Sequence, residues 1–217
     1  MKKAFTLIEL IFVLVVIGVI AAVSLPNLNK NDLSKAAVQV ATHIRYTQHL
    51  AMMDDKFDKT DSNWYKKRWQ IQFNKTIDTI DVWAYTIYSD YTISGNANGV
   101  SEIAKNPYNK NQYLTGGASG FIDLNDNRRM KVMALQETYG IKDIKFSNCG
   151  STAKRISFDT LGRPLNGSPS TANNQVERII TTQCIIKLCE VTDCDAANLD
   201  EAISIFIEPE TGFVDVL

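Results

Sequence analysis

The sequence has little histidine and no excess of charge of either sign. It has two His in 217 residues, and 23 Lys and Arg against 24 Asp and Glu give a net charge of −1. This balance argues against a general nucleic-acid-binding or polybasic membrane-surface protein. The sequence also has no phosphate-binding loop, no Gly-x-Ser-x-Gly motif and no paired-His metal motif. We therefore expect a protein that is not an enzyme and that binds no cofactor.

The apolar residues are concentrated near the N-terminus. Residues 10–23 contain no polar side chain, and Lys2 and Lys3 precede them, which predicts a cytoplasmic N-terminus. As a helix, residues 5–25 would span about 31 Å, the thickness of a bilayer core. The alternatives are a Sec signal peptide cleaved near Ser24 and a buried soluble helix. The last is the weakest, because an all-round apolar helix at the chain end makes a poor core element.

One carboxylate, Glu9, stands at the edge of this apolar run. Such a group costs about 2.5–3.5 kcal/mol at mid-membrane and less near an edge, so it is normally retained for a partner. Cleavage between Ala4 and Phe5 would create a partner, a free α-amine four residues before Glu9. This favours a retained helix over a simple export signal.

Residues 2–11, Lys-Lys-Ala-Phe-Thr-Leu-Ile-Glu-Leu-Ile, resemble the type III signal of the type IV pilin family. In that family a leader ending in Gly, or sometimes Ala, precedes Phe-Thr-Leu-Ile-Glu. The resemblance implies that prepilin peptidase removes residues 1–4 by cutting after Ala4, and that Phe5 is then N-methylated. It also implies that residues 5–25 are kept as both transmembrane anchor and assembly helix, with Glu9 acting in assembly.

A second helical segment is predicted over residues 26–55. Pro26 matches the position of the family's kink-inducing proline, and the alternative is that Pro26 ends the membrane helix. We expect Asp32 to act as an N-cap and the helix to end near Met53. Apolar residues recur at helical spacing and should pack on a sheet: Leu33, Ala37, Val40, Ala41, Ile44 and Ala51. His43 and His49 do not share a face of this helix, so a metal pair is not expected.

The remaining residues, 56–217, have the two-residue period of strands and predict a β-rich globular head. Strands are expected at 69–73, 82–88, 129–135, 141–147, 155–158, 179–188 and 203–207, the last forming a hairpin with 213–216. Residues 94–113 are rich in Asn, Gly and Lys and predict a long surface loop. We therefore expect an α+β fold, in which a long N-terminal helix packs on an antiparallel β-rich head.

Two stretches of the head are similar to the H-type minor pseudopilins, the GspH/FimT-like group. The first is Phe158-Asp159-Thr160-Leu161-Gly162-Arg163-Pro164, and the second is the terminal hairpin, residues 205–216, with its turn at Gly212. Read from the residues alone, Gly162, Arg163 and Pro164 form a turn, because Gly supplies a positive φ and Pro fixes the exit.

All four cysteines lie late in the chain, and an even count in an exported chain indicates two disulfides. Cys184 and Cys189 are too far apart along one continuous strand to be bridged. Cys189 and Cys194 flank a plausible turn, so we prefer the pairs 189–194 and 149–184, with Cys149–Cys189 and Cys184–Cys194 as the other option. The spacing lacks Cys-x-x-Cys and disfavours zinc. Residues 123–127 begin like a calcium loop, but Arg128 replaces the required Gly, so an Asx-rich turn is expected.

The resemblance implies a structural subunit, a minor pseudopilin of a type II secretion system or a minor pilin of a type IV pilus. Its expected partners are other pilin or pseudopilin subunits, prepilin peptidase, the inner-membrane assembly platform and membrane lipid. The chain would cross the inner membrane once, with its head in the periplasm.

Two alternatives remain open. One is a DNA-binding minor pilin, for which residues 66–68 beside aromatic residues form the basic-aromatic cluster. The acidic C-terminal end weakens this alternative, and we expect no nucleic-acid partner. The other is a soluble periplasmic protein released after Ser24.

Overall fold

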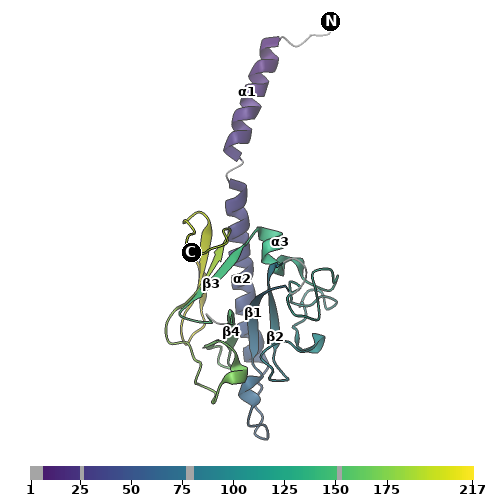
Figure 1. Ribbon diagram of the computed structural model, residues 1–217, viewed down its shortest axis with the longest axis vertical. Helices are drawn as coiled ribbons and strands as arrows, with labels where there is room; N and C mark the ends of the chain where they lie inside the picture. Colours follow the sequence, from purple (N-terminus) through teal and green to yellow (C-terminus); the bar gives the residue numbers. More distant parts are fainter. Residues whose placement is uncertain (1–6, 25–26, 77–80, 151–152) are drawn as a thin grey trace.

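The computed structural model describes residues 7–24, 27–76, 81–150 and 153–217. Two helices come first, α1 (Leu7–Ser24) and α2 (Asn27–Met53). Figure 1 shows α2 running through the globular head, while α1 extends beyond the head toward the N-terminus. Ala4, Phe5 and Pro26 lie outside the described residues.

The α2 helix forms the central element of the head. All six residues of the expected stripe, Leu33 to Ala51, are buried, and Ala36 and Ala37 are fully inaccessible. Alanines at these positions leave room for the sheets to approach the helix closely. The helix ends at Met53, as expected. The prediction of an N-cap at Asp32 is wrong, because α2 already begins at Asn27 and Asp32 lies inside it.

The first sheet has four antiparallel strands in the order β2-β1-β4-β5. They are β1 (Trp69–Lys75), β2 (Trp83–Ser89), β4 (Arg155–Phe158) and β5 (Pro164–Asn166). Its register places Gln70 opposite both Tyr88 and Ser157. One face, which includes Ile71, Phe73 and Ile156, belongs to the hydrophobic core that also contains the α2 stripe.

The second sheet is also antiparallel and four-stranded, in the order β3-β6-β7-β8. Its strands are β3 (Asp143–Ser147), β6 (Cys184–Cys189), β7 (Ala202–Ile207) and β8 (Val214–Val216). The predicted C-terminal hairpin is confirmed by the pairing of Ile205 with Val216 and Ile207 with Val214. The two sheets meet at Phe73 and Phe146, whose ring centroids are 5.6 Å apart.

The α+β expectation is therefore confirmed, and the described residues of the head form two antiparallel sheets. A single hydrophobic cluster contains residues of α2 and of both sheets. The described residues also form a short helix, α3 (Leu135–Tyr139), and four 3₁₀ turns: Trp64–Lys66, Val100–Glu102, Lys131–Met133 and Pro169–Thr171.

The prediction of a strand over residues 129–135 is wrong. The segment forms the 3₁₀ turn Lys131–Met133 and then enters α3 at Leu135. Met133 and Leu135 are fully buried. The apolar residues that suggested a strand therefore pack these short helical turns against the core. Gly140 ends α3 in the left-handed conformation that favours glycine.

The long segment 94–113 is more ordered than the composition predicts. The amide of Ala104 donates to the carbonyl of Ile87 at 2.9 Å, and the amide of Ile87 donates to the carbonyl of Leu114 at 2.9 Å. The segment thus continues the sheet along the edge of β2 and covers that edge. This explains why every residue of β2 is buried.

The α1 helix presents apolar residues on all sides. From Leu7 to Ile20 its large apolar side chains are 39% to 76% exposed. Among the described residues, no helix combines the length and the apolar character that crossing a membrane requires. The expected transmembrane span over residues 5–25 is thus not found within the described part of the chain.

One polar contact lies inside the core between α2 and the first sheet. The Gln39 amide nitrogen lies 3.1 Å from Nε2 and 3.5 Å from Nδ1 of the His43 ring. His43 Nδ1 lies 2.7 Å from the hydroxyl of Tyr85. Burial lowers the pKa of His43 from 6.5 to about 4 and raises that of Tyr85.

We predict that this buried histidine makes the fold sensitive to acid. Because the pKa of His43 is lower in the folded state, the unfolded state takes up the proton first, so stability is full above pH 6.5 and falls as the pH drops toward 4. At about 1.36 kcal/mol per pKa unit, this amounts to about 3 kcal/mol. Urea unfolding between pH 7 and pH 4 measures it. The variant His43→Gln should lose this part of the slope, whereas His49→Gln, on the exposed side of α2, should keep it. Equal slopes in the two variants would contradict the prediction.

Candidate functional site

The expected processing and assembly residues fall in the first part of the chain. Of these, the structure describes Glu9, which lies exposed in the first turn of α1. A carboxylate at this position interacts favourably with the positive end of the helix dipole. No other acidic residue lies between Leu7 and Ser24, so α1 is an apolar helix with one negatively charged side chain in its first turn.

The two turns that resemble the H-type group meet on one side chain of α2. The Gln48 amide donates to the carbonyl of Gly162 at 2.8 Å and to that of Thr211 at 2.9 Å. Gly162 and Gly212 both have positive φ, 79° and 65°. A Cβ on Gly212 would lie 2.5 Å from both Gln48 Nε2 and the Gly162 carbonyl oxygen. Residues far apart in sequence are thus held together at the C-terminal part of α2.

The first of these turns is closed by its own aspartate. Asp159 is buried, and its Oδ1 accepts the amides of Leu161 at 3.0 Å and Arg163 at 2.9 Å. Its Oδ2 accepts Nε of Arg163 at 2.7 Å, and Pro164 then begins β5. Arg163 is therefore held in an internal ion pair. The amide of Gly162 also donates to the carbonyl of Asp159 at 2.9 Å, which closes the turn.

The second turn is tied to α2 at a further point. Arg45 Nη2 donates to the carbonyl of Val214 at 2.7 Å, at the start of β8. Neither Gln48 nor Arg45 was identified from the sequence. On the helical pattern both fall on the polar face of α2, and nothing in the sequence indicates which carbonyl each would meet.

The structure contains both preferred disulfides. Cys149–Cys184 joins the segment after β3 to the start of β6, and Cys189–Cys194 joins the end of β6 to the loop that follows it. The Cα atoms are 5.3 Å and 5.6 Å apart. Both bonds reinforce the second sheet, and none of the described cysteines is free.

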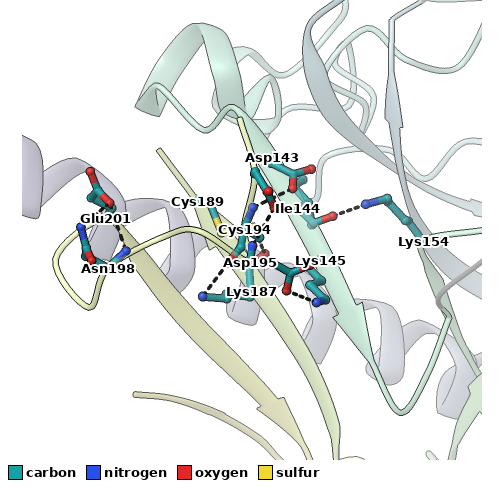
Figure 2. The surroundings of a disulfide bond; sticks show 11 residues. Asp143, Ile144, Lys145, Lys154, Lys187, Cys189, Cys194, Asp195, Asn198 and Glu201 are labelled. Carbon is teal, nitrogen blue, oxygen red and sulfur yellow. Dashed lines mark hydrogen bonds and ion pairs between the residues drawn. A yellow bond between two sulfur atoms is a disulfide. The ribbon is translucent and has the colours of Figure 1, made fainter. Parts of the chain in front are cut away.

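The loop closed by Cys189–Cys194 is also held by polar contacts to β3 and β6 (Figure 2). The amide of Cys194 donates to Asp143 at 3.1 Å, and its carbonyl accepts Nζ of Lys187 at 2.8 Å. Lys145 on β3 forms an ion pair with Asp195. These groups act as structural ties, and the described residues include no cluster of His, Cys, Asp and Glu suited to a metal ion.

The Asp-rich segment 123–127 forms the predicted Asx turns. The amide of Asn125 donates to the carboxylate of Asp123 at 2.8 Å, and the amide of Arg128 donates to that of Asp126 at 2.8 Å. Arg128 also forms an ion pair with Asp126 at 2.6 Å. The carboxylates are thus engaged by the turn itself.

The basic run at residues 66–68 does not form one exposed patch. Arg68 is buried and donates to the carbonyl of Gln175 at 2.9 Å. Lys67 pairs with Asp61 at 2.7 Å, and this hydrogen bond raises the pKa of Lys67. Of the three, only Lys67 forms an ion pair among those of the described residues.

Comparison with known proteins identifies the N-terminal segment. Residues 1–25 match the family model described as the prokaryotic N-terminal methylation motif. The match covers Ala4, Phe5 and Glu9, and indicates a type IV pilin-like substrate of a prepilin peptidase with other pilin subunits as partners. No curated protein and no solved structure matches the chain.

The contact between the two turns and Gln48 gives a stability prediction. Gly212→Ala should lower the free energy of unfolding by about 2–4 kcal/mol, because it adds both a left-handed backbone penalty and a clash. The control is Gly120→Ala, which has a φ of 77° but no atom within 4 Å of the added Cβ. It should cost only about 1 kcal/mol. Urea unfolding of the full chain measures both, and equal losses would show that the convergence on Gln48 contributes nothing.

Proposed function

We propose that the protein is a non-enzymatic structural subunit of a filament, a minor pseudopilin of a type II secretion system or a minor pilin of a type IV pilus. The observation that carries the proposal is the methylation motif over residues 1–25. The motif belongs to chains that a prepilin peptidase processes, and here it contains α1, a helix with exposed apolar side chains.

The proposed maturation begins with cleavage between Ala4 and Phe5, followed by N-methylation of the new terminus. Residues 5–25 then anchor the subunit in the inner membrane until it enters the filament. This proposed anchor includes residues beyond the described helix α1. The head would lie in the periplasm, an oxidising compartment, which agrees with the two disulfides.

In the proposed filament, α1 helices of neighbouring subunits pack side by side. The exposed apolar surface of α1 supports this arrangement, because lateral packing would bury it. Glu9 would pair with the Phe5 amine of a neighbour where water is scarce. Such a pair sets axial register, because a displaced subunit would leave a buried charge unpaired at a cost of several kcal/mol.

We place the subunit in the H-type group, the GspH/FimT-like minor pseudopilins. The Gly162-Arg163-Pro164 turn and the hairpin turn at Gly212 carry this assignment, and their meeting at Gln48 gives both a structural role in one fold. The proposed partners are other pilin subunits, prepilin peptidase, the inner-membrane assembly platform and membrane lipid. We propose no nucleic-acid partner, since Arg68 is buried and Lys67 is paired with Asp61.

The mature N-terminus tests the processing step. Mass spectrometry of the protein purified from its native membrane should find Phe5 as the first residue, with a methyl group on its amine. Replacing Ala4 by a bulky residue such as Leu should leave the precursor uncut. A mature chain that begins at Leu25 would instead identify a Sec signal peptide and overturn the proposal.

Substitution of Glu9 tests the register step. The variant Glu9→Leu should insert into membranes at least as well as the wild type but enter filaments more than about tenfold less, since a register-setting ion pair is lost. The control Ile8→Leu changes a neighbouring apolar residue and should assemble normally. Membrane fractionation and filament shearing measure the two steps. Normal assembly of the Glu9→Leu protein would contradict the mechanism.

A further inference from the structure

A hollow at the far end of the head shares no lining residue with the two glycine turns or with the loop closed by Cys189–Cys194. It has a volume of about 330 Å³ and lies between the start of β1 and the end of β2, with Trp69 and Tyr91 on its walls. Its lining also includes the exposed polar residues Thr92, Asn98 and Ser101. Lys56 of the segment after α2 borders it, and this segment lies at the end of the molecule opposite the N-terminus (Figure 1). Its volume is at the lower end of the range for small-molecule sites.

Both aromatic rings of the hollow are held in place by a lysine-aspartate pair. The indole nitrogen of Trp69 donates to Asp54 at 2.8 Å, and Lys56, which is ion-paired with the same Asp54, lies 5.5 Å from the ring centroid. Tyr91 is 66% exposed, and Nζ of Lys67 lies 4.6 Å from its ring centroid. A cation–π contact at an exposed site favours such an arrangement by about 0.5–1 kcal/mol.

The loop that carries Tyr91 and Thr92 is also fixed. Buried Asp90 accepts the amides of Ser94 at 2.9 Å and Gly95 at 2.7 Å. Buried Glu102 accepts the amide of Thr92 at 2.9 Å and that of Asn98 at 2.6 Å. The walls and the rim are therefore formed before any ligand arrives, which lowers the entropic cost of binding.

The charges around the hollow narrow the class of ligand. Lys56 and Lys67 are each neutralised by an aspartate, Asp54 and Asp61. Glu102 uses both carboxylate oxygens to accept backbone amides. A strongly anionic ligand would find both lysines already paired with aspartates. A cationic ligand would compete with the two backbone amides for the oxygens of Glu102. The hollow instead combines fixed aromatic faces with exposed hydroxyl and amide groups.

We propose that this hollow binds a neutral pyranoside, a sugar ring within a surface glycan. The apolar C–H face of a pyranose matches an aromatic wall, and the ring hydroxyls match Thr92, Asn98 and Ser101. The site would place sugar recognition at the end of the head that points away from α1. This proposal does not depend on the filament proposal, because the hollow is formed within one chain.

Saturation-transfer NMR on the full chain tests the proposal. The protein is kept in a detergent without a sugar headgroup, because maltoside and glucoside detergents are themselves neutral pyranosides. The probes are methyl β-glucoside, methyl β-galactoside and N-acetylglucosamine, with a heparin fragment and a proline-rich peptide as competitors of other classes. We expect saturation of the ring protons of at least one neutral sugar.

Three variants decide whether the signal comes from this hollow. Tyr91→Ala should weaken sugar binding about tenfold, the loss expected for one main wall of a small site. Tyr91→Phe keeps the ring and should bind nearly as the wild type does. Tyr108→Ala removes another exposed tyrosine, 97% accessible and outside the lining, and should change nothing. Near-UV circular dichroism verifies that each variant is folded.

Each other outcome overturns the proposal. These are the absence of saturation with all three sugars, equal binding by the wild type and Tyr91→Ala, and binding of the heparin fragment or the proline-rich peptide alone. The readout is direct binding by the purified protein, so a failure here leaves filament assembly unaffected as a separate result.

Discussion

The packing of α2 against two sheets at once is the constraint on which the head depends. Neither sheet encloses a core by itself, and one hydrophobic cluster contains residues of one face of this helix and of both sheets. Alanines at positions 36, 37 and 41 keep that face narrow enough for both sheets to reach it. The polar residues Arg45 and Gln48 then tie β8 and the two glycine turns to the same helix. The last strand of the chain and both glycine turns are thus attached to the same helix.

Elements whose pattern reflects their own contacts were predictable from the sequence. The stripe of α2, the strands near residues 69–73 and 203–207, and the closing hairpin follow from periodicity and turn residues. The structure of segment 129–135 was not predictable from the sequence. Met133 and Leu135 are buried there by short helical turns, and these turns form only because they pack against the core. The division into two sheets was not visible either, since strand pairing between distant segments leaves no local signal.

The residues of the candidate site also fall into those that the sequence reveals and those that only the fold reveals. The N-terminal motif is contiguous, so a sequence can reveal it, and Ala4, Phe5 and Glu9 lie within the match over residues 1–25. The contact of Gln48 with Gly162 and Thr211 joins three distant segments, so it could not be identified from the sequence. The same is true of the hollow at Trp69 and Tyr91: the sequence indicates a basic-aromatic cluster, and only the fold shows which lysines are neutralised by aspartates.

The position of α2 has a mechanical consequence for any role in which α1 is held while the head bears load. A force along α2 acts on many side-chain contacts in parallel, because the buried stripe extends from Leu33 to Ala51 against both sheets. Contacts loaded together in shear must break together, whereas strands pulled apart from one end separate one pair at a time. Resistance to forced unfolding is governed by the unfolding rate. The head is therefore built to transmit tension through its centre, with the disulfide-linked second sheet on one side and the first sheet on the other.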